Sequence, residues 1–254
     1  MVKQLINQGV FLLGKTVSLF GIFKHLSFFT MSDAEKSPMK IAVLISGNGS
    51  NLQAIIEHQQ QSKNLYEIVL VISNRPEAFG LKRAQKAGIA TKVIDHTNFT
   101  GREAFDEQMK IELDKAEVEL VVLAGFMRIL SAEFTEHFLG RMLNIHPSLL
   151  PKYQGLNTHQ RALDSGDKEH GLSVHFVTPE LDGGPVIVQS KTNIQNDDTA
   201  ESLQQRIHSL EHTAYPTVVE WFAQGRLLFK QSKVYFDAKE LNSPIILTSE
   251  NSNA

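Results

Sequence analysis

Asn144 and His146 stand two residues apart at the end of an apolar run, in Asn-Ile-His-Pro-Ser-Leu-Leu-Pro. In a β-strand, this spacing points both side chains to the same face. Asp182 follows in a glycine-rich turn, Leu-Asp-Gly-Gly-Pro, from which its carboxylate could reach the imidazole. An amide donor, an imidazole and a carboxylate can together stabilise a tetrahedral oxyanion and move a proton. Because the chain has no cysteine, a thiol nucleophile is excluded, and the three residues predict acyl transfer without a covalent enzyme intermediate.

Asn144 and His146 also have a structural interpretation, because a buried Asn–His pair can simply satisfy the backbone groups of a turn. The Pro-Ser-Leu-Leu-Pro after His146 and the later Leu-Asp-Gly-Gly-Pro favour the catalytic interpretation. The His-Glu-x-x-His pattern of zinc hydrolases does not occur in the sequence, and without cysteine there is no Cys-based zinc site. We therefore expect no catalytic metal.

A second segment, Ser46-Gly47-Asn48-Gly49-Ser50-Asn51, lies between an apolar strand at 41–45 and a helical stretch at 51–58. Backbone N–H groups at the start of a helix can cradle an anion. The segment matches the dinucleotide fingerprint only in part, because Leu52 stands where the third glycine belongs, and it lacks the Gly-Lys-Ser/Thr ending of a P-loop. Two interpretations stay open: a site for a monophosphate, and a tight turn that only caps the helix.

A third segment, Ala-Gly-Phe-Met-Arg-Ile-Leu at 124–130, ends another predicted strand. Open α/β sheets bind their ligands at this carboxyl edge. Its apolar side chains can be simple core, but Arg128 inside the run is harder to explain by packing. An apolar slot with exposed backbone groups would suit a flat heteroaromatic ligand.

The elements that must position these groups alternate regularly from Met39 onward. Apolar runs predict strands at 41–45, 66–72, 91–94, 118–124 and 142–145, with helices between them at 51–58, 78–87, 102–115 and 132–138. Residues 152–168 are polar and predict a loop with a helical turn or two, before strands at 172–177 and 185–191, a helix at 199–222 and a hairpin at 225–236. Continuous Val, Ile and Leu runs between helices are typical of a parallel sheet covered on both faces. We predict a single doubly wound α/β domain with a mostly parallel, Rossmann-like sheet.

Composition bounds the remaining possibilities. With 254 residues and a formal net charge of −3, the chain has no broad electrostatic footprint for nucleic acid. Residues 1–32 hold no Asp or Glu, but Lys15 and Lys24 interrupt their apolar stretches, so none reaches the ~18–20 residues of a membrane span. We expect a leader at 1–38, a catalytic domain at 39–238 and a tail at 239–254 that frays from about Ser243. The leader is open to three interpretations: a disordered or wrongly assigned start, a targeting or membrane-associated segment, and a folded part.

Four motifs in a fixed order carry a resemblance that covers residues 40–225. They read Ile-Ser-Gly-Asn-Gly-Ser-Asn-Leu, Ala-Gly-Phe-Met-Arg-Ile-Leu, Asn-Ile-His-Pro-Ser-Leu-Leu-Pro and Leu-Asp-Gly-Gly-Pro. In them the chain resembles the folate-dependent glycinamide ribonucleotide formyltransferases of purine biosynthesis. The resemblance implies transfer of a formyl group from the cosubstrate 10-formyltetrahydrofolate to the amine of glycinamide ribonucleotide.

The same resemblance implies a role for each matching residue. It implies that Asn144, His146 and Asp182 are catalytic. It also implies that Gly49, Ser50 and Asn51 bind the substrate phosphate and that Glu211 binds the ribose hydroxyls. The residues that it implies for binding of the formyl folate are Arg102, Met127, Arg128, Ile129, Leu130 and Asn144. It further implies that residues 152–169 form a loop that folds over the pterin. This chain departs from many members at Gln154 and Asn157 in that loop and at His208 near the ribose. Asn157 removes one proton acceptor, which leaves more of the proton transfer to His146, Asp182 and water.

Two other functions stay open: a formyltetrahydrofolate hydrolase, and a catalytically inactive protein that binds folate or nucleotide. The phosphate segment favours a ribonucleotide substrate over the hydrolase, and the complete catalytic trio argues against an inactive protein. We expect small-molecule partners, no nucleic acid, no stable membrane span and a cytoplasmic location. A homodimer is left open.

Overall fold

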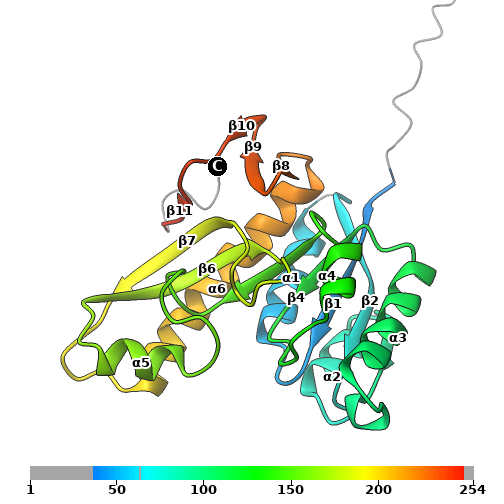
Figure 1. The fold of residues 1–254 in the computed structure, drawn as a ribbon, viewed down its shortest axis with the longest axis horizontal. Coiled ribbons are helices and arrows are strands. Elements are labelled where there is room, and N and C mark those ends of the chain that lie inside the picture. Colours follow the sequence, from blue (N-terminus) through cyan, green and yellow to red (C-terminus); the bar gives the residue numbers. More distant parts are fainter. Residues whose placement is uncertain (1–36, 63, 249–254) are drawn as a thin grey trace, which may run out of the picture. The chain divides into compact units, whose positions relative to one another are not determined.

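The computed structural model describes residues 37–62 and 64–248, so nearly all of the expected leader at 1–38 lies outside the described residues. The main sheet has eight strands in the order β11-β7-β6-β5-β4-β1-β2-β3 (Figure 1). Their bounds are β1 Met39–Ile45, β2 Tyr66–Ser73, β3 Thr91–Val93, β4 Leu120–Leu123, β5 Met142–His146, β6 Glu169–Phe176, β7 Val186–Asn193 and β11 Ile245–Ile246. A second sheet pairs β8 (Leu227–Lys230), β9 (Lys233–Phe236) and β10 (Lys239–Glu240).

The helices follow the strands as the sequence predicts. They are α1 Ser50–Gln61, α2 Phe79–Lys86, α3 Arg102–Lys115, α4 Ala132–His137, α5 Thr158–Asp164 and α6 Ala200–Ala223, with a 3₁₀ turn at His96–Asn98. The longest helix, α6, begins with a capping box, because Thr199 Oγ1 accepts from the Ser202 N–H and Ser202 Oγ accepts from the Thr199 N–H. The helical turns expected within 152–168 are present as α5.

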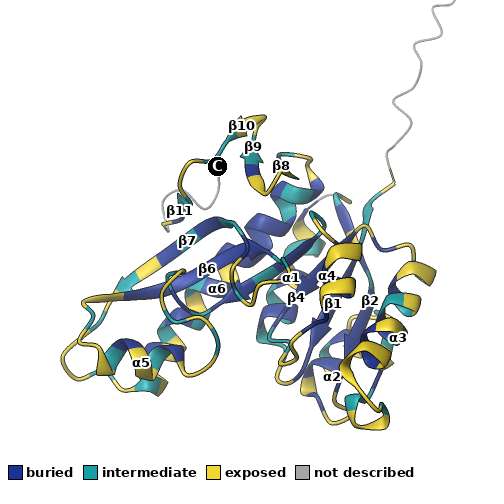
Figure 2. Ribbon diagram, in the orientation of Figure 1, coloured by how far each residue is buried: buried dark blue, intermediate teal, exposed yellow. Residues whose placement is uncertain are grey.

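Strand β1 shows why the sheet is covered on both faces. Ile41, Val43 and Ile45 point into a core cluster with α1 and α6, whereas Ala42 and Leu44 point into a second cluster with α3 and α4. All five side chains are fully buried, and Figure 2 shows the same burial along the central strands. The continuous apolar run is therefore the signature of a strand buried on both sides.

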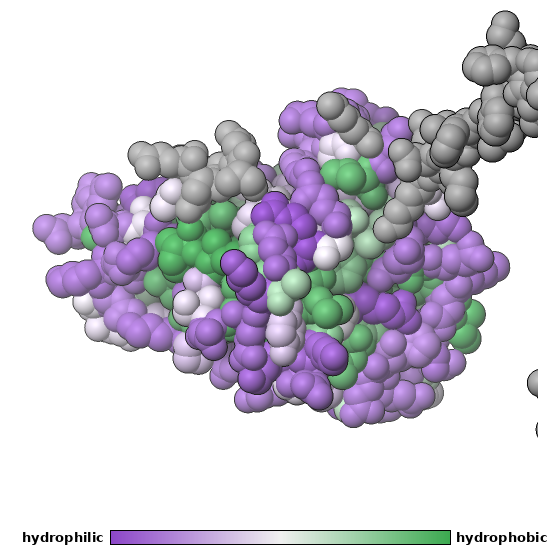
Figure 3. Space-filling model, turned by 90° about the horizontal axis from the view of Figure 1, so that it is seen from above, coloured by the Kyte–Doolittle hydropathy of each residue, from purple (hydrophilic) through white to green (hydrophobic). Residues whose placement is uncertain are grey.

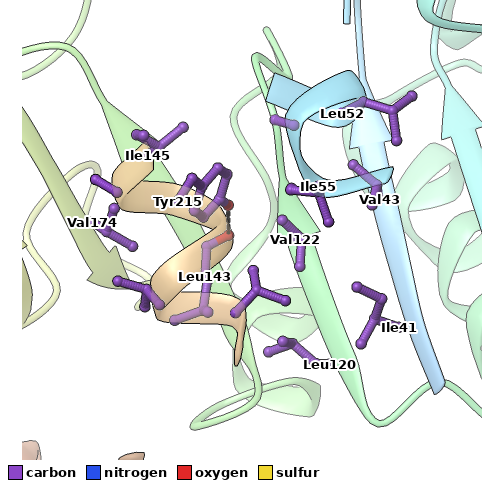
Figure 4. Packing of buried hydrophobic residues seen from close by; sticks show 14 of the residues in the cluster. Ile41, Val43, Leu52, Ile55, Leu120, Val122, Leu143, Ile145, Val174 and Tyr215 are labelled. Atoms are coloured by element: carbon purple, nitrogen blue, oxygen red, sulfur yellow. Dashed lines mark hydrogen bonds between the residues drawn. The ribbon is translucent and has the colours of Figure 1, made fainter. Parts of the chain in front are cut away.

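The sheet is mostly parallel. In the main sheet of the described residues, β1, β2, β3, β4 and β5 pair in parallel, as does β11 with β7, whereas β5–β6 and β6–β7 are antiparallel. The predicted single α/β domain with a mostly parallel sheet is confirmed. In the first core cluster, Tyr215 of α6 lies beside Leu143 of β5, and its hydroxyl is hydrogen-bonded to the Leu143 carbonyl (Figure 4).

The expected fraying from about Ser243 is wrong for the residues up to 248. Ile245 and Ile246 form β11, which adds a parallel strand beside β7. The Leu247 N–H donates to the Gln189 carbonyl at 2.9 Å, and its side chain is buried. Seen from above, the surface of the described residues carries patches of hydrophobic residues among mostly hydrophilic ones (Figure 3). Leu247 is buried in the first core cluster and Ile245 packs against that cluster partly buried, while Ile246 stays exposed. Burial of these two apolar side chains, together with the pairing to β7, outweighed the polar composition around them.

Candidate active site

The phosphate segment occupies the turn between β1 and α1. Gly49 has a φ of 73° and immediately precedes the first residue of α1, Ser50. A cavity of about 430 Å³ opens above this turn and is lined by residues 46–51 together with Glu211. The N-terminus of α1 therefore faces the cavity, as an anion site requires.

Glu211 comes to this cavity from α6. Its carboxylate accepts a hydrogen bond of 2.8 Å from Asn51 Nδ2, and its side chain is buried. Burial raises the pKa of Glu211, although the Asn51 hydrogen bond opposes the shift. Among the residues that the structure describes, the buried Asn51 Oδ1 atom has no hydrogen-bond partner. Gly49, Ser50, Asn51 and Glu211, expected together at the ribonucleotide, do line one cavity.

A second, larger cavity of about 1,090 Å³ adjoins the first, since Met127, Pro147 and His159 line both. Four large apolar side chains are at least half exposed at this cavity: Met127 (60%), Ile129 (57%), Leu156 (73%) and Leu181 (50%). Exposed apolar groups gathered at one place are typical of a ligand site.

Of the residues expected at the formyl folate, five line this larger cavity: Arg102, Met127, Arg128, Ile129 and Asn144. Leu130 does not, because its side chain packs in the core cluster with α3 and α4. The segment 127–131 is held by hydrogen bonds at both ends. The Met127 N–H donates to Ser46 Oγ at 2.7 Å, and the Ser131 N–H donates to Asp106 Oδ2 at 2.6 Å.

The three residues expected to be catalytic meet in the same cavity. Asn144 and His146 lie on β5, and Asp182 lies in the turn between β6 and β7 with a left-handed φ of 49°. His146 Nδ1 is 3.5 Å from Asp182 Oδ2, and Asn144 Nδ2 is 3.5 Å from Asp182 Oδ1. The turn passes close over β6, since a Cβ on Gly184 would lie 1.9 Å from the Phe176 carbonyl oxygen. A side chain at 184 would therefore displace the turn that carries the carboxylate.

Both nitrogens of His146 face hydrogen-bond acceptors. Nε2 donates to the Tyr153 carbonyl at 2.9 Å, because a carbonyl cannot donate, and Nδ1 faces the Asp182 carboxylate. The imidazolium, which carries an N–H on each nitrogen, fits this surrounding. The loop also contacts Asp182, whose Oδ2 accepts the Gly155 N–H at 2.9 Å and whose carbonyl accepts from Gln154 Nε2 at 3.2 Å.

His175 is a neighbour of the trio to which sequence reasoning gave no role. It lies opposite Asn144 on β6. Its Nδ1 donates to the Phe176 carbonyl at 2.9 Å, which leaves Nε2 to accept the Asn144 amide N–H at 3.1 Å. Burial lowers the pKa of His175, which keeps the ring neutral and able to accept. The alternation of apolar and polar residues at 172–176 was the only sequence signal for it, and that signal does not distinguish a core histidine from one that orients a catalytic amide.

A histidine pair joins the loop segment to β6. His159 Nδ1 and His170 Nε2 are 3.1 Å apart, and burial lowers the pKa of each ring from 6.5 to about 4. With both pKa values near 4, both rings are uncharged at neutral pH, and one ring donates while the other accepts. This pair ties α5 to the start of β6.

Within residues 37–62 and 64–248, the closest approach to a metal-ligand spacing lies on α6. His208 and His212 stand four residues apart on α6 with stacked rings, which is a spacing used by some metal sites. No group of three or more His, Asp or Glu side chains in this part of the chain is arranged to hold a metal ion. None of the described helices is long and apolar enough to cross a membrane.

Comparison with known proteins places these features in a family. The profile of the family described as formyl transferase matches residues 39–219. The phosphoribosylglycinamide formyltransferase of Escherichia coli K12 is 52% identical over 203 residues, which cover 80% of this chain and 96% of that protein. The trifunctional purine biosynthetic protein adenosine-3 of Drosophila melanogaster is 49% identical over 191 residues, or 74% of this chain and 14% of that protein. The solved phosphoribosylglycinamide formyltransferase of Coxiella burnetii superposes with a TM-score of 0.80 at 52% identity, covering 84% of this chain and all of that one.

Proposed function

This chain belongs to the formyl transferase family, and from that membership we propose that it transfers a formyl group from 10-formyltetrahydrofolate to the amine of glycinamide ribonucleotide in purine biosynthesis. The observation that carries the proposal is the arrangement of two adjoining cavities. One is lined by an anion-binding turn and Glu211, and the other is lined by apolar groups and by Asn144, His146 and Asp182. This is the arrangement needed to bring a phosphorylated amine to a flat acyl donor.

The ribonucleotide would bind with its phosphate at the backbone N–H groups of Gly49, Ser50 and Asn51. Glu211 would accept hydrogen bonds from the ribose hydroxyls, since its buried carboxylate has only Asn51 as a hydrogen-bond donor in the described structure. The formyl folate would lie in the larger cavity between the apolar side chains, with Arg102 and Arg128 available for its carboxylates. Leu130 would support this cavity from the core rather than contact the ligand.

In the reaction, the neutral amine of the ribonucleotide attacks the formyl carbon, and the oxygen of the formyl group becomes an oxyanion. Asn144 donates to that oxyanion with the N–H that lies 3.5 Å from Asp182, because its other N–H is held by His175. His146 donates with Nε2 after exchanging the Tyr153 carbonyl for the oxyanion. Loss of one such donor typically lowers the rate by about 10²–10³.

Collapse of the tetrahedral species breaks the bond between the formyl carbon and the folate nitrogen. The attacking nitrogen loses one proton and the leaving nitrogen gains one, so no net proton is consumed. Asp182 would carry this proton through water, and its negative charge would hold His146 in the donor form. The loop contacts at Gly155 and Gln154 would keep the Asp182 turn in place.

The test is the absorbance change when the purified chain is mixed with 10-formyl-5,8-dideazafolate and glycinamide ribonucleotide. Turnover that requires both compounds supports the proposal. Loss of the formyl group without the ribonucleotide would instead identify a hydrolase, and binding of the folate without any turnover would identify an inactive binding protein.

We also propose the cytoplasm as the place of action, and a chain without cysteine fits its reducing conditions. The homodimer stays a prediction, which sedimentation of the full chain would check.

A further inference from the structure

Helix α2 packs directly against the phosphate segment. Arg83 Nε donates to the Asn48 carbonyl at 3.0 Å, and Arg83 Nη2 donates to Asn48 Oδ1 at 3.0 Å. The Gly80 N–H, one turn earlier, donates to the Gly47 carbonyl at 3.1 Å. Three hydrogen bonds from α2 therefore reach two consecutive residues of the turn.

The backbones of α2 and the turn are in contact. A Cβ on Gly49 would lie 2.7 Å from the Gly80 Cα, and a Cβ on Gly80 would lie 2.5 Å from Ile45 Cδ1. Gly49 also needs its left-handed φ of 73° to aim the first N–H groups of α1. Because neither glycine leaves space, the turn cannot move toward α2, and the hydrogen bonds oppose movement away from it.

Arg83 is itself held in place. Its guanidinium lies 5.0 Å from the centre of the Phe79 ring, and Nη1 is 3.4 Å from Gln53 Oε1. It lines a groove between α1 and α6 that meets the phosphate cavity at Ser50, and Arg83 itself is not among the residues that line the phosphate cavity. A half-buried arginine with a fixed plane is suited to hold a loop, since its fork makes two hydrogen bonds in one geometry.

We propose that Arg83 is a positioning residue for the substrate phosphate: it fixes Asn48 so that the N–H groups of residues 49–51 converge on one point. The proposal rests on the proposed function only in taking the phosphate as the ligand of this turn. An anion site made of backbone N–H groups depends on their alignment before the ligand arrives. Loss of Arg83 should therefore weaken binding of the ribonucleotide and leave the formyl donor and the chemical step unchanged.

The test compares Arg83→Met with Arg83→Lys and with the matched control Lys82→Met. Lys82 is the neighbouring exposed cation, 5.8 Å from the same Phe79 ring, with no hydrogen bond to the turn. We expect Arg83→Met to raise the calorimetric Kd and the KM for glycinamide ribonucleotide about tenfold (~1.4 kcal/mol). The kcat and the KM for the formyl donor should stay within about twofold. The Kd of Arg83→Lys should lie between those of the parent and Arg83→Met, because an ammonium can replace one of the hydrogen bonds but not the paired donors of the guanidinium.

A second measurement does not depend on the reaction. Amide hydrogen exchange of the unliganded protein should speed up at residues 47–51 in Arg83→Met and stay at the parent rate in Lys82→Met. If the parent binds no ribonucleotide, the proposed function fails while the exchange comparison still tests the role of Arg83. Equal Kd values and equal exchange in Arg83→Met and Lys82→Met would overturn the inference. So would a parallel loss of both KM values and of thermal stability, which would make Arg83 a general structural residue.

Discussion

Replacement of Asp182 by Asn is the most direct test of the catalytic geometry. The change keeps the shape of the side chain but removes the charge that lies 3.5 Å from His146 Nδ1. Both side chains are less than one tenth exposed, at 8% for His146 and 9% for Asp182, so water screens the pair poorly. At 3.5 Å and an effective dielectric constant of about 20, two unit charges interact by at most about 5 kcal/mol.

Part of that interaction will be recovered by relaxation and by entry of water. We therefore expect the transition state to lose about 3–4 kcal/mol, which lowers kcat by about 10²–10³. Neither substrate is bound by Asp182 alone, so both KM values should change by less than about fivefold. The assay is the steady-state rate at saturating formyl donor and ribonucleotide, with each KM measured separately.

Glu180→Gln is the control, because it removes a carboxylate from the same turn at an exposed position two residues away. Its kcat should equal that of the parent. A kcat for Asp182→Asn within about threefold of the parent would refute the proposed role of the carboxylate. A large rise in both KM values at unchanged kcat would show instead that Asp182 only shapes the cavity.

Three further predictions concern binding and stability. Glu211→Gln should raise the KM for the ribonucleotide by about 10–100-fold, because it removes a charged acceptor. Burial raises the pKa of Glu211, so the ionised carboxylate opposes folding above that pKa. Calorimetry should therefore show that Glu211→Gln is more stable than the parent at neutral pH. The pKa values of His159 and His170 fall from 6.5 to about 4 on folding, so the unfolded chain binds more protons between those pH values. The free energy of unfolding, measured with denaturant, should therefore fall as the pH drops from 6.5 through 4. His170→Gln should flatten this pH dependence. Tyr215→Phe removes a fully buried hydroxyl within 2.9–3.0 Å of carbonyls on β4 and β5, and thermal unfolding should report a loss of about 1–2 kcal/mol.

Much of the fold is encoded locally. The apolar runs and the helical stretches predicted the central strands and the helices, because a strand buried on both faces must be apolar throughout. The tail shows the limit of this reasoning. Ile245 and Ile246 form a strand only because the edge of β7 lies beside them, and that edge is more than fifty residues away in the sequence.

The candidate site shows the same division. Glycine-rich turns and the two-residue spacing of Asn144 and His146 predicted which side chains would face a cavity, since both signals are local. The contact of Asn51 with Glu211 joins residues 160 positions apart, and only the resemblance to a family suggested it. The partner of the Asn144 amide, His175, comes from an antiparallel neighbour strand, and its role depends on a register that composition does not reveal.

Ser46 connects the phosphate turn to the segment that lines the larger cavity, and no sequence motif predicted this connection. Its hydroxyl donates to Asn74 Oδ1 at 2.6 Å and accepts the Met127 N–H at 2.7 Å, in a buried position. Ser46 begins the phosphate turn, and Met127 belongs to the segment that lines the larger cavity. Because the single hydroxyl proton is committed to Asn74, the oxygen is held as an acceptor for Met127, and neither segment can shift without breaking a buried hydrogen bond. Transfer of a formyl group requires the reacting atoms to be held within about 3–3.5 Å. The separation of the two substrates is therefore set by the core beneath the cavities as well as by the residues that contact them.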